Sequence, residues 1–257
     1  MKYRLVIADV DGTLVEPAAK ATTAASARVI TAVKHCFDAG VIFSIASARS
    51  LDWVEGLIQS LKLTSPIILD NGARIYDCLV EKYIYTSLLS HQRAMEILKI
   101  LRNFPYKKYV VDEKKRFEYI PGKTEDFGNV VKMMILHVKP YEAEEIYEMI
   151  SRLPGIKVTK SVSGINPVKE SIHITHEDAA KEIALHKIVD LLGINLSEVA
   201  AIGDSYNDFS LLTSAGLKIA MGNAVDEIKA IADYIAPSYQ EDGVADAIEK
   251  FIINKND

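Results

Sequence analysis

The feature that most constrains the fold is a short apolar run that ends in two acidic residues. Residues 5–8 read LVIA and lead into Asp9, Val10, Asp11 and Gly12. A run of apolar residues without alternation is typical of a strand buried on both faces of a parallel sheet. In such sheets, ligands bind beyond the carboxyl ends of the strands. The run therefore predicts a central strand that presents Asp9 and Asp11 to a ligand.

The segments after this strand alternate between helical and strand-like patterns. Residues 22–40 have apolar positions at helical spacing, 41–47 form a second apolar strand, 50–63 a second helix with Ser50 as its N-cap, and 66–73 a third strand with a turn. The same alternation resumes after residue 176. A β-α-β rhythm of this kind indicates a parallel sheet with helices on both faces.

Residues 82–176 have a different pattern, in which strand-like runs follow one another between helices. Adjacent strands without helical crossovers indicate an antiparallel α+β unit. The fold class expected is therefore α/β, with a parallel-sheet core and an inserted α+β domain. We predict a core domain of residues 1–81 and 177–257 and an inserted domain of residues 82–176.

Composition and charge exclude several classes of protein. The 257 residues are 49% hydrophobic and 25% charged, with a net charge of −5, which is typical of a globular protein and argues against a nucleic-acid partner. Cys36 and Cys78 have neither CxxC spacing nor a histidine cluster beside them, which argues against a zinc site or a disulfide framework. The first apolar run is too short for a signal peptide or a membrane span, so we expect a cytoplasmic protein without a membrane partner.

Acidic and polar residues gather at the predicted ends of the core strands. The sets are Asp9 and Asp11; Ser47, Ala48 and Arg49; Asp70, Asn71 and Gly72; and Asp204, Asn207 and Asp208. Four carboxylates at the ends of two strands repel one another unless a cation lies between them, and an all-oxygen set suits Mg²⁺.

Phosphoryl transfer is the chemistry that this set of residues favours. Of two close carboxyls such as Asp9 and Asp11, one can act as a nucleophile while the other exchanges a proton. Ser47 and the amides around Ala48 could hold phosphate oxygens, and Lys181 could supply positive charge. We expect Arg49 to anchor its loop by a salt bridge.

Four ordered motifs resemble those of the haloacid dehalogenase superfamily: DVDGTL (9–14), SIASAR (44–49), Lys181 in KEIALHKI, and GDSYND (203–208). Three further segments are similar to those of the Cof-type phosphatases with a type-2 cap, namely DNGA (70–73), MGNA (221–224) and EDGVADAI (241–248). That branch includes archaeal phosphoglycolate phosphatases and sucrose-phosphate phosphatase. The resemblance implies a Rossmann-like core with an inserted cap.

The resemblance also implies a role for each motif residue. Asp9 would be the nucleophile and Asp11 the general acid and base. Phosphate would be bound by Ser47, Ala48, Lys181 and Asn207. Mg²⁺ would be bound by Asp9, by Asp11 through its backbone carbonyl, by Asp204 and by Asp208. Asn71 and Gly72 are possible substrate-side residues, although Asn71 could equally cap a turn.

Two positions depart from the family pattern. Ser47-Ala48 stands where the family usually has Thr-Gly, and Glu182 follows the lysine where glycine is usual. Alanine lacks the backbone freedom of glycine. An acid beside Lys181 could weaken phosphate binding, or it could point to solvent. We expect residues 113–116 to form a solvated hairpin tip and His173 to be structural.

The function predicted is a Mg²⁺-dependent phosphatase acting through an aspartyl-phosphate. Its substrate would be a small phosphorylated metabolite, such as a sugar phosphate or a phosphoglycolate-like acid. A phosphomutase needs the same four motifs and is the alternative. A non-catalytic phosphate-binding protein is a further alternative, but it predicts the loss of a motif residue, and none is lost.

Overall fold

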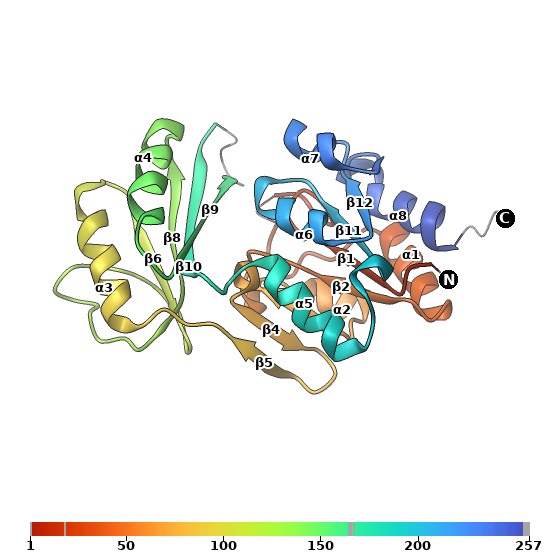
Figure 1. Ribbon diagram of the computed structural model, residues 1–257, viewed down its shortest axis with the longest axis horizontal. Helices are drawn as coiled ribbons and strands as arrows, with labels where there is room; N and C mark the ends of the chain where they lie inside the picture. Colours follow the sequence, from red (N-terminus) through yellow and green to blue (C-terminus); the bar gives the residue numbers. More distant parts are fainter. Residues whose placement is uncertain (1, 18, 164–165, 167, 254–257) are drawn as a thin grey trace.

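The structure is a computed structural model that describes residues 2–17, 19–163, 166 and 168–253. Two sheet-containing parts lie side by side, one built around a parallel sheet and the other around an antiparallel sheet (Figure 1). Among the described residues, no helix is both long and apolar enough to cross a membrane.

The central sheet is parallel and has the strand order β13-β12-β11-β1-β2. Its strands are β1 (Leu5–Ala8), β2 (Ile42–Ile45), β11 (Val199–Gly203), β12 (Leu217–Ala220) and β13 (Tyr234–Ile235). β1 lies between β11 and β2, and each of its four residues is at most 1% exposed. The prediction of a central strand buried on both faces is therefore confirmed.

Helices cover both faces of this sheet. They are α1 (Ala27–Asp38), α2 (Glu55–Leu61), α5 (Lys181–Leu192), α6 (Phe209–Ser214), α7 (Asp226–Ile231) and α8 (Gly243–Ile248). Right-handed crossovers that leave the centre in opposite directions place α1 and α6 on opposite faces. α1 packs against α2 and α8, whereas α6 packs against α5. Short 3₁₀ turns lie at Leu51–Trp53, Asp70–Gly72, Leu101–Asn103, Leu196–Glu198, Tyr206–Asp208 and Tyr239–Glu241, and a π-helical turn at Glu249–Ile253.

Two helices begin later than the sequence pattern predicted. α1 begins at Ala27 because the Ser26 hydroxyl accepts the N–H of Val29 at 3.2 Å, which caps the helix. α2 begins only at Glu55, after a 3₁₀ turn, and Ser50 makes no capping hydrogen bond. The Ser50 hydroxyl instead donates to Asp70 Oδ1 at 2.5 Å.

An antiparallel hairpin extends the third strand and was not predicted. β3 (Pro66–Leu69) touches the central sheet through a parallel bridge between Ala46 and Ile68, and pairs with β4 (Arg74–Asp77), which pairs with β5 (Lys82–Thr86). β5 is largely exposed and carries no buried apolar face, so its sequence lacks the pattern of a core strand. The domain boundary at residues 81 and 82 stays a prediction.

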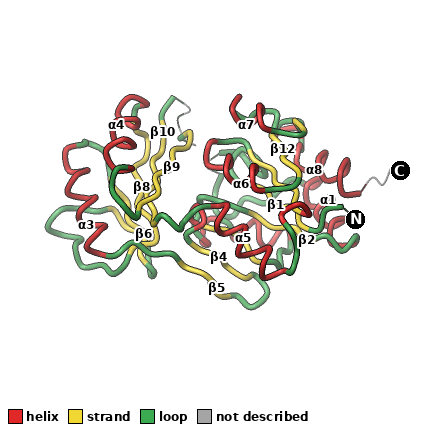
Figure 2. Tube along the Cα trace, viewed as in Figure 1, coloured by secondary structure: helices red, strands yellow, loops and turns green. Residues whose placement is uncertain are grey.

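The second sheet is antiparallel, with the order β7-β6-β8-β10-β9, and we call it the cap sheet. Its strands are β6 (Lys108–Asp112), β7 (Arg116–Glu118), β8 (Val130–Val138), β9 (Ile156–Val162) and β10 (Glu170–His176). α3 (His91–Ile100) and α4 (Pro140–Ser151) lie on the side remote from the central sheet (Figure 2). Along β10, Ile172 and Ile174 join the apolar core of this part, whereas Ser171 and His173 line a cavity toward the central sheet. The predicted α/β class with an additional antiparallel part is confirmed.

Candidate active site

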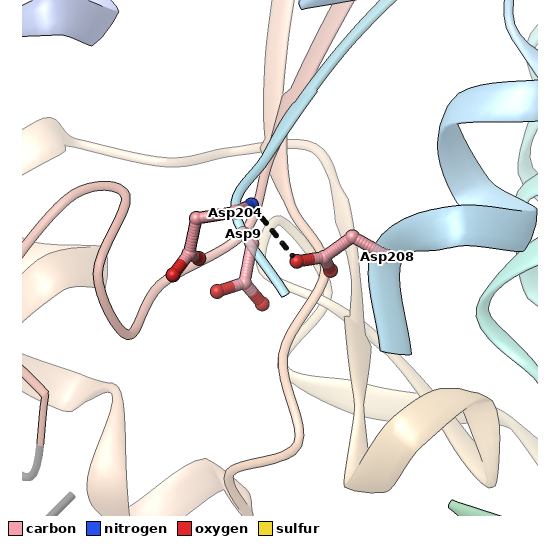
Figure 3. A group of neighbouring side chains, drawn as sticks. All are labelled: Asp9, Asp204 and Asp208. Carbon is pink, nitrogen blue, oxygen red and sulfur yellow. Dashed lines mark hydrogen bonds between the residues drawn. The ribbon is translucent and has the colours of Figure 1, made fainter. Parts of the chain in front are cut away.

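Three carboxylates converge at the carboxyl end of the central sheet (Figure 3). Asp9 follows β1 directly, and Asp204 follows the neighbouring strand β11. Asp208 ends the 3₁₀ turn behind Asp204. One carboxylate oxygen from each of the three lies within 4.8 Å of the others. Adjacent parallel strands thus bring together residues nearly 200 positions apart.

Electrostatic repulsion within this cluster favours a bound cation. Burial raises the pKa of Asp9 above its usual range, and the negative charge of Asp208 raises it further. Burial, followed by the charges of Asp9 and Asp208, likewise raises the pKa of Asp204. Asp9, Asp204 and Asp208 all offer carboxylate oxygens, which suit a hard divalent cation.

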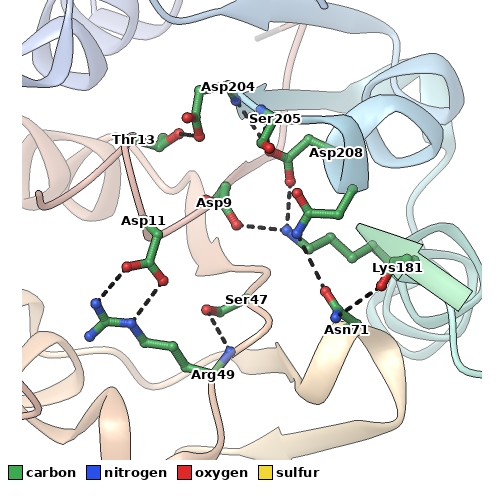
Figure 4. Close-up of polar contacts among 12 residues, drawn as sticks. Asp9, Asp11, Thr13, Ser47, Arg49, Asn71, Lys181, Asp204, Ser205 and Asp208 are labelled. Carbon is green, nitrogen blue, oxygen red and sulfur yellow. Dashed lines mark hydrogen bonds and ion pairs between the residues drawn. The ribbon is translucent and has the colours of Figure 1, made fainter. Parts of the chain in front are cut away.

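Lys181 supplies one positive charge to this cluster. Its Nζ lies 2.6 Å from Asp9 Oδ1 and 2.5 Å from Asp208 Oδ1 (Figure 4). Burial alone would lower the pKa of Lys181, but the two carboxylates outweigh it and raise the pKa. One ammonium does not balance the charge of three carboxylates, so a divalent cation can bind without leaving an excess of positive charge.

Close backbone packing fixes the positions of Asp204 and Asp208. A Cβ on Gly12, whose φ is +82°, would lie 2.4 Å from Asp204 Oδ2, and a Cβ on Gly203 would lie 2.6 Å from Asp208 Cβ. Thr13 Oγ1 donates to Asp204 Oδ1 at 3.0 Å. Asp208 Oδ2 accepts two backbone N–H groups, at 3.2 and 3.1 Å. These glycines are therefore needed for the carboxylates to approach.

Asp11 lies beside the cluster and faces Arg49. Arg49 Nε donates to Asp11 Oδ2 at 2.9 Å and Nη2 donates to Oδ1 at 2.6 Å (Figure 4). This two-point geometry orients a carboxylate well. The expected salt bridge of Arg49 is confirmed, and its partner is the predicted acid and base.

The loop of residues 47–49, which we call the 47–49 loop, follows β2 at the same edge. Ser47 is fully buried, and its Oγ accepts the N–H of Arg49 at 3.0 Å. Ala48 lines the cavity in front of Asp9. Ala48 is not among the residues with positive φ, so alanine replaces the usual glycine without strain at this position.

The two asparagines of the predicted site form a chain between the two parts of the molecule. Asn207 Nδ2 donates to Asn71 Oδ1, and Asn71 Nδ2 donates to Thr159 Oγ1 of β9, both at 3.4 Å. Gly72 lies against the backbone just before Lys181, where a Cβ would come within 2.3 Å of the Ala180 carbonyl. The substrate-side roles of Asn71 and Gly72 stay predictions.

Glu182 is turned away from the cluster. Its carboxylate accepts the Ser210 hydroxyl at 2.5 Å and lies 3.7 Å from Lys157 Nζ. The acid that follows Lys181 is therefore engaged by α6 and β9.

A cavity of about 1020 Å³ lies between the central sheet and the cap sheet. Asp9, Asp11, Asp204 and Asn207 line it from one side, and Lys132, Ser161, Ser171 and His173 from the other. The sequence assigned none of these four cap-sheet residues to a site. Alternation along β8, β9 and β10 is the signal that could have indicated which side chains face the core.

The structure adds to two predictions about the cap sheet. Residues 113–116 are exposed, as expected of a hairpin tip, but they also line the cavity. His173 is buried and lies on the cavity wall, where burial, reinforced by the charge of Lys132, lowers its pKa to about 3. A neutral imidazole therefore faces the site.

Comparison with known proteins gives matches along nearly the whole chain. A family model described as haloacid dehalogenase-like hydrolase matches residues 6–126 and 105–248. The chain is 31% identical over 258 residues to 5-amino-6-(5-phospho-D-ribitylamino)uracil phosphatase YcsE of Bacillus subtilis (strain 168), covering 97% of this chain and 96% of that protein. It is 29% identical to phosphoglycolate phosphatase 1 of Saccharolobus solfataricus, with coverages of 97% and 96%.

Solved structures share the fold. A haloacid dehalogenase-like hydrolase from B. subtilis superposes with a TM-score of 0.82 at 21% identity, covering 97% of this chain and all of the other. A sugar phosphatase of subclass IIB superposes with a TM-score of 0.80 at 24% identity, covering 98% and 100%. With relatives named as phosphatases, the predicted enzyme class, a phosphoric monoester hydrolase, is supported. The family match, which spans most of both sheets, establishes that the chain belongs to the haloacid dehalogenase-like hydrolase family.

Proposed function

We propose that this protein is a Mg²⁺-dependent phosphatase that hydrolyses a small phosphorylated metabolite through an aspartyl-phosphate on Asp9. The observation that carries the proposal is the position of the Asp9 carboxylate. It lies at the end of the central strand, paired with Lys181 and next to Asp204 and Asp208, and it opens on the large cavity.

The donor set supports Mg²⁺ as the cation. Asp9, Asp204 and Asp208 offer only carboxylate oxygens, and no cysteine or histidine joins this group among the described residues. Mg²⁺ is usually bound by one or two carboxylates together with substrate phosphate oxygens. When bound, it would neutralise charge on the phosphoryl group and relieve the repulsion among the three carboxylates.

The residues of the site have different roles in two successive phosphoryl transfers, first to Asp9 and then to water. An oxygen of Asp9 attacks phosphorus, the bond to the leaving oxygen breaks, and that oxygen takes a proton that Asp11 would carry once its ion pair with Arg49 opens. A water then gives a proton to Asp11 and attacks the aspartyl-phosphate, so that the bond to Asp9 breaks and orthophosphate leaves. Ser47 and Lys181 would hold phosphate oxygens during both steps.

The test is hydrolysis of p-nitrophenyl phosphate by the pure protein. We expect orthophosphate release in Mg²⁺. In EDTA the rate of hydrolysis should fall at least about 100-fold, because the carboxylates then lose their countercharge. Equal rates in Mg²⁺ and EDTA would contradict the proposal. A phosphomutase would behave differently, since it would pass the phosphoryl group to a sugar without net release of orthophosphate.

The cap-sheet wall supports a hydroxylated leaving group. Ser171 and His173 are 7% and 8% exposed and line the cavity. Nδ1 of His173 has no hydrogen-bond partner among the described residues, and Nε2 lies 3.4 Å from the Ser161 hydroxyl. Buried polar groups are rarely left unpaired. These neutral hydroxyl and imidazole groups suit the hydroxyls of a sugar or polyol, whereas Lys114, Lys115 and Arg116 add positive charge elsewhere on the cavity lining.

A substrate panel checks this preference. We expect kcat/KM for pentose and hexose phosphates to exceed that for phosphoglycolate by about tenfold, because lost hydrogen bonds in a buried polar site are costly. Ser171→Ala should lower the ratio of kcat/KM for the best sugar phosphate to that for p-nitrophenyl phosphate by about fivefold. A higher value for phosphoglycolate, or an unchanged ratio, would favour the phosphoglycolate-like acid instead.

A further inference from the structure

Lys132 is a buried lysine of the cap sheet whose ammonium reaches the central-sheet part of the molecule. It lies on β8, and its side chain is 3% exposed. Its Nζ lies 2.7 Å from Asp70 Oδ1 and donates to the Ala48 carbonyl at 2.7 Å. Lysine is almost never fully buried without a partner, so these two contacts account for its position.

The contact with Ala48 fixes one peptide unit of the 47–49 loop. The Ala48 carbonyl and the Arg49 N–H belong to the same planar unit. Lys132 holds the carbonyl, and Ser47 Oγ accepts the N–H at 3.0 Å. The orientation of the peptide is therefore set at both ends. The Ser47 oxygen acts as the acceptor here, so this contact does not use the proton of the Ser47 hydroxyl.

The contact with Asp70 supports the turn that braces this loop. Asp70, Asn71 and Gly72 all have positive φ, at +54°, +58° and +93°. Such conformations are uncommon for residues other than glycine and persist only when the surroundings hold them. The turn donates two backbone N–H groups to the loop, from Asp70 to the Arg49 carbonyl at 2.9 Å and from Asn71 to the Ser47 carbonyl at 3.0 Å.

Asp70 needs a countercharge, and Lys132 provides it. Its carboxylate is fully buried and receives the Ser50 hydroxyl and the Lys132 ammonium on Oδ1. The nearest nitrogen of Arg74 is 4.0 Å from Oδ2. A buried carboxylate is costly unless it is paired and hydrogen-bonded. Lys132 therefore links the turn, the loop and the cap sheet.

We propose that Lys132 is a positioning residue for phosphate binding. The cap sheet supplies the cation that holds the 47–49 loop, so the loop takes its phosphate-binding geometry when the cap sheet lies against the core. This inference rests on the proposed function and adds to it, because the cap sheet then contributes to affinity for the phosphate group itself as well as for the leaving group.

The experiment compares two lysine-to-methionine variants of the cap sheet. Lys132→Met removes the cation. Lys108→Met is the matched control, because Lys108 is a partly buried lysine of β6 whose ammonium donates to the Phe104 carbonyl within the same part. The inhibition constant of orthophosphate against p-nitrophenyl phosphate and its calorimetric Kd are measured in Mg²⁺, together with the melting temperature. We expect both constants to rise at least about tenfold in Lys132→Met and to stay within about twofold in Lys108→Met.

Asp70→Asn separates positioning from direct contact. If Lys132 acts through the turn and the loop, Asp70→Asn alone raises the inhibition constant and the Kd of orthophosphate. The double variant Lys132→Met/Asp70→Asn then differs from Lys132→Met by less than about twofold in both constants. If Lys132 instead touched the phosphate, Asp70→Asn would leave the constants at the wild-type value, and the inference would be overturned. Lys132→Gln, which keeps N–H donors but loses the charge, serves as a second variant if Lys132→Met does not fold, and it should give intermediate constants.

The role of Lys132 and the phosphatase activity can be rejected separately. A wild-type protein that hydrolyses the ester and binds orthophosphate, while Lys132→Met matches it, rejects the inference alone. A wild-type protein that does neither rejects the proposed function, and the inference falls with it.

Discussion

Asp9→Asn is expected to lower kcat by about 10⁴-fold or more while leaving the protein folded. The amide keeps the shape of the side chain and can still accept from Lys181, but it cannot attack phosphorus. Hydrolysis of p-nitrophenyl phosphate in Mg²⁺ measures the loss. A variant that kept more than about one hundredth of the wild-type rate would contradict the role of Asp9 as nucleophile.

The same variant should gain stability when divalent cations are absent. Burial and the charge of Asp208 raise the pKa of Asp9 in the folded protein. As pH rises from the unfolded value near 4 to the raised folded value, the folded state holds a proton that the unfolded state has lost, so the wild type loses stability. Asp9→Asn does not lose this stability, because asparagine has no carboxyl group to titrate. In EDTA its melting temperature should exceed that of the wild type at pH 7.5, and the difference should vanish toward pH 4.

Asp38→Asn is the matched control for both measurements. Asp38 ends α1, and its side chain is 57% exposed beside Lys34. The control should keep wild-type activity and a wild-type response to pH. A stability gain shared by both variants would show that the effect does not come from the carboxylate cluster.

Lys181→Met is expected to lower kcat by about 10³-fold and to destabilise the protein strongly. Lys181 is 2% exposed and pairs with Asp9 and Asp208. Removing one partner of a buried ion pair costs about 3–5 kcal/mol, because the remaining charge is left uncompensated. Denaturant unfolding in EDTA measures the loss, and Mg²⁺ should recover part of it.

A double variant separates the two effects of Lys181. In Lys181→Met with Asp208→Asn, one charge of each sign is gone, so much of the stability should return while activity stays low. Lys187→Met on the same helix is the control, since Lys187 is exposed and lies over the Tyr85 ring. Recovery of activity together with stability would mean that Lys181 acts only through folding.

The sequence predicted the parts of the fold that follow from hydrophobic pattern. β1, with its uninterrupted apolar run, lies where the pattern indicated, and α1, with its helical spacing, lies within the predicted range but begins only at Ala27. β4 and β5 were missed because β5 is mostly exposed and depends on cross-strand pairing, which has no signature in a single strand. The hydrophobic pattern of a sequence indicates which residues are buried, and an exposed hairpin has few buried residues.

The candidate site was predictable where residues stand at strand ends. Asp9, Asp204, Asp208 and Lys181 meet because neighbouring parallel strands and one helix start converge at a single edge. Lys132 could not be found in this way. It lies in the middle of a strand, and only the packing of one sheet against the other brings it to Ala48.

The alternation along β10 also bears on how the enzyme could acquire new substrates. Ile172 and Ile174 serve the apolar interior under α3 and α4, while Ser171 and His173 point to the opposite side and line the cavity. Successive side chains of a strand lie on opposite faces. Contacts with the substrate and packing of the apolar core therefore depend on alternate residues of the same strand. A combinatorial library at Ser161, Ser171 and His173 could therefore yield variants with new substrate specificities while the apolar core stays unchanged.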